Sequence, residues 1–478
     1  MKKIFQLAIG GVFVSILTFA QNDVDALRYS QINFGATARS SAMAGAFGAL
    51  GGDFSTLSIN PAGIAIYRRS EFTFTPGFFT QTTNSSYQGN IGSDYKTNFN
   101  FGNAGIVIST YEGNTKNDWK GISFGFGYNR LNNFNNRLVM EGKNNYSSLL
   151  DVYLAEANSK GDVSSFDKFG TKLAWDTYLL DTTSGGSFYH MLPKYGETQS
   201  KSINTSGSMG ETVFTLGGNY SDKLYLGATI GMPHIRYTEE SSYEEKGDTN
   251  ALNGFKSFTL DQNLTTTGNG FNLKFGLIYK PTDWVRFGGA LHSPSWFTMH
   301  DSWSSSMTSH FATKTYDEQS PSGTYDYSLT TPTRAIGSIA FIIKKVGLID
   351  ADYEMVDYSS ARLHATKYNF LNENTAIREK YTQSNNFRVG TEWRLNPMSI
   401  RGGVAYYGSP FNKAMDNDGS RISYTAGIGF REENFFIDFA YVYTMTSDKY
   451  YFYDASIVNP SVNDSNSSSV MMTLGFKF

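Results

Sequence analysis

The sequence contains no cysteine among its 478 residues. A chain without cysteine forms no disulfide, carries no lipid on a cysteine and offers no thiolate ligand to a metal. A metal site would then need histidine and carboxylate ligands, yet none of the six histidines belongs to a His-Glu-x-x-His motif or a comparable zinc spacing. We therefore expect neither a metal nor a cofactor.

Long apolar runs are also missing. After residue 20 no stretch of about 18 apolar residues occurs, so the sequence predicts no membrane-spanning helix. The apolar run near the start, residues 4–19, follows Lys2 and Lys3 and ends in a cleavage-site pattern at Thr18-Phe19-Ala20. These features predict a secretory signal peptide over residues 1–20, in preference to an N-terminal anchor helix.

Net charge is small, at −3, which argues against a nucleic acid as partner. Hydrophobic residues make up only 40% of the chain, which is low for a packed globular core. Aromatic residues reach 15%, and 47 residues are glycine. This composition favours a membrane barrel with a lipid-facing surface and a polar lumen.

Short and long connections alternate between the strand-like segments. Only Glu432 and Glu433 separate one pair of strand-like runs, and Pro397 alone separates another, whereas other connections are long and polar. This alternation is typical of an all-β fold, a transmembrane antiparallel β-barrel, whose strand number is even in single-chain bacterial proteins. About fourteen strands are predicted, over residues 71–80, 102–111, 119–130, 211–220, 223–237, 271–280, 284–293, 334–343, 346–358, 387–396, 398–409, 421–431, 434–446 and 470–478. We accordingly expect the barrel to occupy residues 71–478, with long extracellular loops.

Within these strands, apolar side chains alternate with polar or small ones. Phe271, Leu273 and Phe275 share one face of a strand, and Lys274 lies on the other face. Such alternation places apolar side chains against lipid and polar side chains in the lumen. The final strand ends in Phe478, an aromatic terminus that resembles the signal read by the outer-membrane barrel assembly machinery, which we expect as a partner during biogenesis.

Two inward-facing cations, Lys274 and Arg286, lie on adjacent predicted strands. Both are candidates for contact with the carboxylate head group of a ligand, because a cationic group hydrogen-bonds a carboxylate strongly. Alternatively, they pair with acids of the wall or of an internal plug, since an unpaired charge in a confined lumen is costly. The inward-facing Asp352, Arg388 and Glu392 are expected to form such pairs between neighbouring strands.

Residues 21–70, between the signal peptide and the first strand, have a different composition. Small residues dominate residues 36–52, and a turn-forming cluster follows at Asn60, Pro61, Ala62 and Gly63. A barrel of this size has an interior that wall side chains alone do not fill. We therefore expect residues 21–70 to form a plug, or hatch, inside the lumen.

The same segment carries a family resemblance. The order Ala38-Arg39, then residues 42–47, Asp53 and Asn60-Pro61-Ala62-Gly63 resembles the N-terminal hatch of the FadL/TodX family of outer-membrane transport proteins for hydrophobic compounds. The hairpin over residues 270–294 and the motif at residues 352–359 are similar to that family as well. The style of the long loops is similar to members from Bacteroidetes-type bacteria.

This resemblance implies a monomeric fourteen-stranded barrel in the outer membrane of a Gram-negative bacterium, in contact with lipid and lipopolysaccharide. The channel would take up long-chain fatty acids or other hydrophobic small molecules through a mostly apolar pocket. Asn60, Pro61, Ala62 and Gly63 would block the lumen until the hatch shifts. The ligand would leave sideways beside a kinked third strand, for which Gly125 and Gly127 are the candidates, although both glycines equally fit as small lumen residues beneath the plug.

The sequence leaves three rival functions. An enzyme has no supporting motif. A haemin receptor would use His190, His300 and His310 of predicted external loops as ligands, whereas surface histidines without function are the simpler explanation. The third rival is a structural barrel docked onto a larger secretion or assembly complex.

Overall fold

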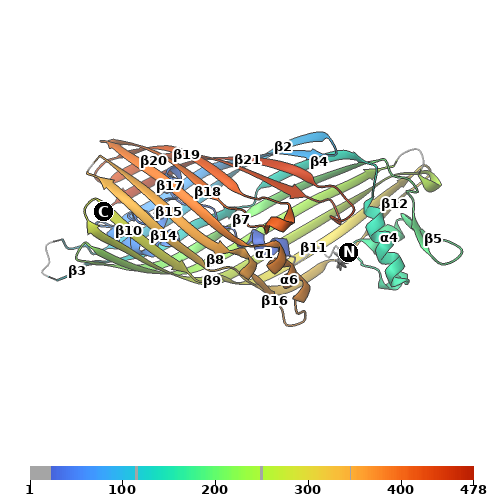
Figure 1. The fold of residues 1–478 in the computed structure, drawn as a ribbon, viewed down its shortest axis with the longest axis horizontal. Coiled ribbons are helices and arrows are strands. Elements are labelled where there is room, and N and C mark those ends of the chain that lie inside the picture. Colours follow the sequence, from blue (N-terminus) through green and yellow to red (C-terminus); the bar gives the residue numbers. More distant parts are fainter. Residues whose placement is uncertain (1–22, 114–116, 248–250, 345) are drawn as a thin grey trace, which may run out of the picture.

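The computed structural model describes residues 23–113, 117–247, 251–344 and 346–478, so the predicted signal peptide lies outside the described residues. Within them, fourteen strands close into one antiparallel barrel (Figure 1). The barrel strands are β1 (Glu71–Tyr87), β2 (Asn90–Ser109), β3 (Trp119–Asn133), β7 (Glu197–Tyr220), β8 (Leu224–Lys246), β9 (Phe255–Thr282), β10 (Val285–His292), β14 (Arg334–Ile343), β15 (Gly347–Asp357), β17 (Gln383–Leu395), β18 (Met398–Tyr407), β19 (Arg421–Arg431), β20 (Phe435–Tyr450) and β21 (Ser461–Lys477).

The barrel closes between its first and last strands. Glu71 of β1 lies opposite Val107 of β2 on one side and opposite Lys477 of β21 on the other. This pairing joins the edges of the first and last strands, whose backbone groups would be costly to leave unpaired in the membrane. The predicted antiparallel barrel of about fourteen strands is confirmed.

The remaining elements lie inside the barrel, extend its sheet or belong to the connections between its strands. No described helix is long and apolar enough to cross a membrane. These elements are the strands β4 (Asn136–Asn144), β5 (Leu180–Thr182), β6 (Phe188–His190), β11 (Trp296–Phe311), β12 (Thr315–Gln319), β13 (Gly323–Thr330) and β16 (Arg362–His364), the helices α1 (Asp23–Arg28), α2 (Ala38–Ala42), α3 (Thr56–Ile59), α4 (Leu149–Lys160), α5 (Thr171–Asp176) and α6 (Leu371–Lys380), and the 3-10 turns η1 (Pro61–Ile66), η2 (Val163–Ser165), η3 (Leu252–Gly254), η4 (Tyr358–Ser360) and η5 (Lys413–Met415).

Several strands are longer than the sequence predicts. On β8 the outward side chains Leu226, Ile230 and Met232 are apolar and exposed, whereas Arg236 and Glu240 farther along are polar and exposed. An apolar outer surface is needed only at the level of the lipid. The backbone ladder continues past that level, so hydropathy alternation marks the spanning part of a strand and misses its outer extension.

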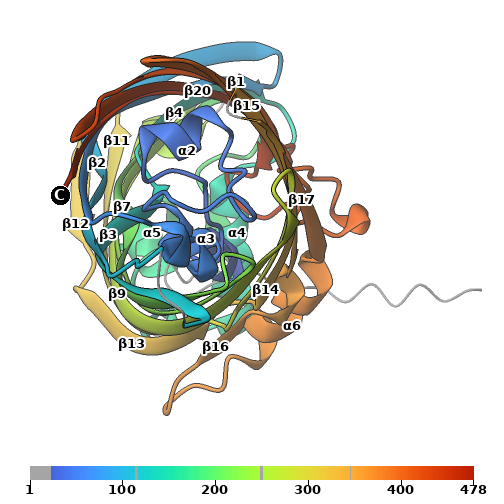
Figure 2. The ribbon, with the colours of Figure 1, turned by 90° about the vertical axis from the view of Figure 1, so that its left-hand side faces the viewer.

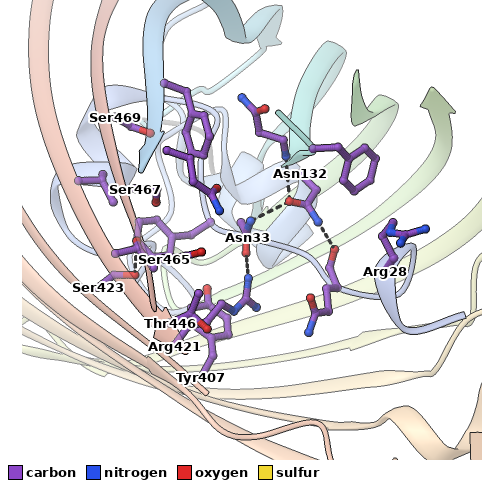
Figure 3. Close-up of a pocket in the computed structure, with 18 residues that line it drawn as sticks. Arg28, Asn33, Asn132, Tyr407, Arg421, Ser423, Thr446, Ser465, Ser467 and Ser469 are labelled. Atoms are coloured by element: carbon purple, nitrogen blue, oxygen red, sulfur yellow. Dashed lines mark hydrogen bonds between the residues drawn. The ribbon is translucent and has the colours of Figure 1, made fainter. Parts of the chain in front are cut away.

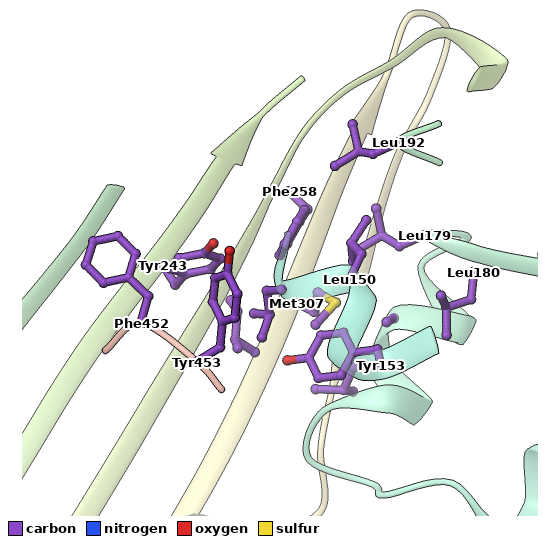
Figure 4. Packing of buried hydrophobic residues seen from close by; sticks show 14 of the residues in the cluster. Leu150, Tyr153, Leu179, Leu180, Leu192, Tyr243, Phe258, Met307, Phe452 and Tyr453 are labelled. Carbon is purple, nitrogen blue, oxygen red and sulfur yellow. The ribbon is translucent and has the colours of Figure 1, made fainter. Parts of the chain in front are cut away.

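The outer end carries a folded cap, which we define as residues 136–196. Its helix α4 begins with a capping box formed by Ser148 and Asp151. Leu150 of α4 packs with Tyr243 of β8 and Phe258 of β9 in one buried apolar cluster (Figure 4). The long polar loop predicted here is therefore an ordered layer over the outer end of the barrel.

The N-terminal segment, residues 23–70, fills much of the lumen. Figure 2 shows α2 and α3 inside the ring of strands. Met43, Ala44 and Phe47 have no exposed surface. The small residues of this segment allow close approach to the wall: a Cβ at Gly390 of β17 would lie 2.4 Å from the Met43 carbonyl oxygen.

Candidate functional site

Asn60 fastens the N-terminal segment both to itself and to the wall. Its Oδ1 accepts a hydrogen bond from the Ala62 backbone N at 3.2 Å and so caps η1, in which Pro61 is the first residue. Its Nδ2 donates to the carbonyl oxygens of Gly48 at 2.6 Å and of Leu277 on β9 at 3.2 Å. A single amide therefore connects the turn, the neighbouring part of the segment and the barrel.

The wall around this turn is made of glycine. A Cβ at Gly276 of β9 would lie 2.0 Å from Asn60 Oδ1, and a Cβ at Gly227 of β8 would lie 2.3 Å from the Pro61 carbonyl. Within the segment, a Cβ at Gly63 would lie 2.7 Å from the Thr56 side chain. Residues 60–63 thus sit in a close-fitting wall, and any larger side chain at these glycines would displace the turn.

Two acidic residues of the wall hold the N-terminal segment. Glu392 of β17 accepts a hydrogen bond from Arg39 Nε of the segment at 2.8 Å and another, also at 2.8 Å, from Arg401 Nε of β18. Asp352 of β15 accepts from the backbone N of Gly48 at 3.1 Å, and it also lies 3.4 Å from Arg388. The sequence predicts these residues as pairs between strands, and it contains no signal that their second partner is the segment inside.

Lys274 and Arg286 are both engaged by the protein. Lys274 forms an ion pair with Glu211 of β7, and Glu211 also accepts from Ser58 Oγ of the N-terminal segment at 2.9 Å. Arg286 donates to the Leu50 carbonyl oxygen at 2.6 Å. Lys274 thus pairs with an acid of the wall, whereas Arg286 bonds to a backbone carbonyl of the segment.

Gly125 and Gly127 lie in a fully paired part of β3. Gly127 is opposite Gly105 of β2. A Cβ at Gly125 would lie 2.6 Å from Leu57, and a Cβ at Gly127 would lie 2.7 Å from Phe54, both of the N-terminal segment. These glycines therefore make room for apolar side chains of the segment.

The pairing of β3 with its neighbours becomes irregular a few residues beyond Gly127, toward the outer end of the barrel. The ladder between β2 and β3 runs from Ser109 and Ser123 to Asn103 and Asn129, and stops there. At this level the register of β2 against β1 shifts so that Gly102 has no partner, and the register of β3 against β7 shifts at Leu131. Bulges bend a strand and end its pairing, which explains why the two strands separate.

Beyond the bulges, side chains alone join the two sides. We call this interval the seam, between residues 90–102 of β2 and residues 130–144 of β3 and β4. Across it, Asn133 Nδ2 donates to Asn98 Oδ1 at 3.3 Å, and Arg130 Nε donates to the Phe101 carbonyl oxygen at 3.0 Å. Lys96 Nζ reaches a backbone carbonyl oxygen of β7 at 2.7 Å. No backbone ladder between β2 and β3 or β4 extends along the seam in the described residues.

A chamber of about 280 Å³ lies next to the seam, between the N-terminal segment and the wall (Figure 3). Hydroxyl and amide groups line much of it, among them Ser423, Thr444 and Ser467, together with the rings of Phe34 and Phe79. The sequence predicts a mostly apolar pocket. The difference arises because most positions of β19, β20 and β21 that line the chamber are serine or threonine.

The histidines proposed as haem ligands each have a separate partner. His190 Nε2 lies 3.0 Å from Asp151, His300 Nδ1 lies 2.6 Å from Asp326, and His310 lies near a threonine. Among the residues that the structure describes, no group of three histidine or carboxylate side chains is arranged to hold a metal. Nothing in this geometry favours the haemin alternative.

Comparison with known proteins identifies the family. A family model described as "Outer membrane protein transport protein (OMPP1/FadL/TodX)" matches residues 203–477, from within β7 to the end of β21. No curated protein matches the chain. Among solved structures, a Pseudomonas aeruginosa FadL homologue is similar with a TM-score of 0.57 and 15% identity, covering 94% of this chain and 100% of that chain.

The Pseudomonas putida toluene transporter TodX is similar with a TM-score of 0.54 and 11% identity, covering 94% of this chain and 99% of that one. At such low identity the two structures establish the shared fold alone, whereas the family model covers more than half of the chain. The chain therefore belongs to the OMPP1/FadL/TodX family of outer-membrane transport proteins and is, as a member, an outer-membrane channel for hydrophobic compounds and not an enzyme.

Proposed function

We propose that this channel takes up long-chain fatty acids or other hydrophobic small molecules, and that residues 21–70 are a plug that gates it. The observation that carries the proposal is a difference in bonding. Backbone ladders close most of the barrel wall, whereas side chains such as Asn60, Arg39 and Glu392 hold the N-terminal segment in it. A segment held by a limited set of side-chain contacts is able to shift without opening the barrel.

We further propose that the ligand leaves sideways through the seam. Phe99 and Phe101 of β2 point outward beside the start of the seam and are exposed, as expected for residues in contact with lipid. The N-terminal segment also reaches this level, because Asn33 N donates to the Leu131 carbonyl oxygen at 2.9 Å. A shift of the plug would thus break or move this contact at the bulge from which the seam starts.

Other residues have supporting roles in this proposal. Asn60, Pro61, Ala62 and Gly63 form the block itself, and Gly125 and Gly127 provide space for the plug beside the exit. Lys274 and Arg286 are held by Glu211 and Leu50 in the plugged state, so any contact with a ligand head group follows displacement of the plug.

We expect the protein to work as a monomer surrounded by lipid and lipopolysaccharide, after insertion by the barrel assembly machinery. The loop style favours a Bacteroidetes-type member of the family.

The test is uptake by a Gram-negative host that lacks its own channel of this family. Cells expressing the full chain are supplied with carbon-14 oleate or with carbon-14 toluene, and we expect faster uptake of at least one of them. A folded barrel in the outer membrane with no uptake of either probe would contradict the proposal. Co-purification of a stoichiometric protein partner in that case would favour a structural barrel.

A further inference from the structure

On the barrel exterior, the outer edge of the apolar band follows one row of paired residues across β3, β7, β8 and β9. Arg130 of β3 lies opposite Gly210 of β7, which lies opposite His234 of β8. His234 in turn lies opposite Asn269 of β9. This row marks the level at which the acyl chains of the outer leaflet end and the head groups begin. On three of the four strands, the outward side chain just below the row is apolar or aromatic, namely Tyr128, Met232 and Phe271.

Two arginines lie at this level on the outer surface. Arg130 is in the row, and Arg236 of β8 is one outward position farther out and exposed. Nε of Arg130 donates to the Phe101 carbonyl oxygen at 3.0 Å, and its two terminal nitrogens have no acceptor among the described residues. Neither arginine forms an ion pair in the part of the chain that the structure describes. Both guanidinium groups therefore have donors left for an external acceptor.

The acids nearest to these arginines are engaged elsewhere. On β3, β7, β8 and β9, the nearest outward acid is Glu240, two outward positions beyond Arg236, and it accepts from Asn204 Nδ2 at 3.2 Å. The acid of β2, Asp94, forms an ion pair with Arg137 at 3.1 Å. The surface around the two arginines thus carries positive charge that favours an anion from outside the protein.

Aromatic rings cover the wall directly below the arginines. The Tyr128 ring lies over Gly210, where a Cβ would come within 2.3 Å of it, and it stacks on His234 with ring centres 5.7 Å apart. Farther into the apolar band, Phe126 and Phe214 are exposed, and their ring centres are 4.8 Å apart. Cations at the head-group level therefore adjoin an apolar surface at the acyl-chain level, which is the arrangement that an anionic lipid needs.

We propose that Arg130 and Arg236 bind a phosphate group of a phosphorylated glycolipid of the outer leaflet, the lipid A part of lipopolysaccharide, on the outside of the barrel. Outward hydroxyl and amide side chains at the same level offer hydrogen bonds to its sugars, namely Ser208, Thr267 and Asn269. The site is open to water, so free phosphate would bind it weakly, whereas acyl chains hold a lipid phosphate at this level and raise its effective concentration. The site lies outside the lumen and is independent of which molecule the channel takes up.

The test is native mass spectrometry of the full chain in detergent, titrated with hexa-acyl diphosphoryl lipid A. Because a hydrogen bond to a charged group is strong, Arg130→Gln combined with Arg236→Gln should weaken lipid A binding about tenfold to one-hundredfold. Arg378→Gln removes an exposed charge from α6, away from the apolar band, and should leave binding unchanged. Unchanged binding in the double variant, or an equal loss in the Arg378 control, would overturn the site.

Two further ligands separate a lipid phosphate from acyl chains alone and from a free anion. Lipid A stripped of both phosphates should bind the natural chain only as weakly as diphosphoryl lipid A binds the double variant. Inorganic phosphate in large molar excess should leave bound lipid A in place. Full-strength binding of the stripped lipid, or displacement of lipid A by inorganic phosphate, would contradict a lipid phosphate site.

A variant of Ser208 keeps the test valid if the double variant fails to fold. Ser208 lies opposite Arg236, so Ser208→Asp places a carboxylate beside that guanidinium and should weaken diphosphoryl lipid A binding. Ser304→Asp adds the same charge farther out on β11, opposite Asn263 of β9, and should not weaken it. Retarded migration of the unheated protein on a gel monitors folding of each variant. Equal binding by these two folded variants would overturn the proposal.

Discussion

Two neighbouring pairs of strands in this barrel are closed in different ways. The ladder between β7 and β8 runs without interruption from Tyr220 opposite Leu224 to Thr198 opposite Lys246. The ladder between β2 and β3 stops at Asn103, although β2 continues to Asn90. One pair is joined by backbone hydrogen bonds along its whole length, and the other changes to side-chain contacts halfway.

This difference separates permanent closure from closure that can be released. Inside a ladder, breaking one bond leaves its neighbours in place, so separation needs many bonds to break together. A side-chain hydrogen bond contributes only about 0.5–1.5 kcal/mol and is replaced by water or ligand when it opens. The seam and the side-chain contacts of the N-terminal segment are both of the second kind, so changing either of them tests the distinction.

The largest effect should come from removing the segment. Deleting residues 21–69 should leave a folded barrel, because the wall ladders do not depend on the segment, and should turn a closed channel into a conducting one. Single-channel recording in planar bilayers measures the conductance, and retarded migration of the unheated protein on a gel monitors the barrel. A folded barrel that stays closed would contradict the plug.

Locking the seam should block transport almost completely. Asn98→Cys with Asn133→Cys, bridged by a short bifunctional thiosulfonate, joins the two sides where they now meet only through side chains. The matched control, Thr80→Cys with Thr97→Cys, bridges β1 and β2 where they already pair. Uptake should stop in the first variant, recover with reductant, and remain normal in the control. Normal uptake with a locked seam would exclude sideways release there.

A smaller effect is expected when one anchor of the segment is weakened. Glu392→Gln leaves Arg39 and Arg401 without their shared acid, and breaking a buried pair in this way costs about 3–5 kcal/mol. The segment should detach intermittently and produce brief conductance bursts. The control Glu433→Gln alters an exposed carboxylate in a turn and should remain closed. Equal behaviour of the two variants would show that Glu392 does not hold the plug.

The smallest effect concerns the cap, which is also attached partly through side chains. Glu245 at the outer end of β8 accepts from Ser148 Oγ and the Leu149 backbone N of α4, and burial raises the pKa of its carboxyl from the ordinary 4.5 to about 7. Between pH 4.5 and about 7, the Glu245 carboxyl is therefore protonated when the cap is docked and deprotonated when the cap is undocked.

Docking of the cap should accordingly be strongest at low pH and weaken as the pH rises through about 7. Glu245→Gln should remove this pH dependence. Protease resistance of the cap, measured between the two pH extremes, checks the prediction. Resistance that increases with pH, or a dependence retained in Glu245→Gln, would contradict it.

Strand positions were predictable where the signal was local. The predicted strand over residues 421–431 coincides with β19, because apolar and polar side chains alternate along it and a short turn follows. Outer extensions such as the far end of β8 were missed because both faces there are polar. The bulges at Gly102 and Leu131 were missed because a bulge is defined against a partner strand, and Gly102 does not differ in sequence from other wall glycines.

Site residues also divide into those that a local pattern predicts and those whose partners are distant in sequence. The turn at residues 60–63 is readable because proline and glycine impose their backbone geometry wherever they occur. The second partner of Glu392, Arg39 of the N-terminal segment, is 353 positions away in sequence, and no local pattern contains it. The same is true of the hydrogen bond between Arg421 and Asn33, which line the chamber and are 388 positions apart.

By itself the sequence determined that this protein crosses the membrane as strands, how many it uses and which face of each meets lipid, because these properties depend on the period of neighbouring side chains. Only the tertiary structure decided where the wall changes from backbone to side-chain closure and which side chains face the chamber. Those properties depend on register between strands and on a segment folded into the lumen, and both are set by contacts distant in sequence.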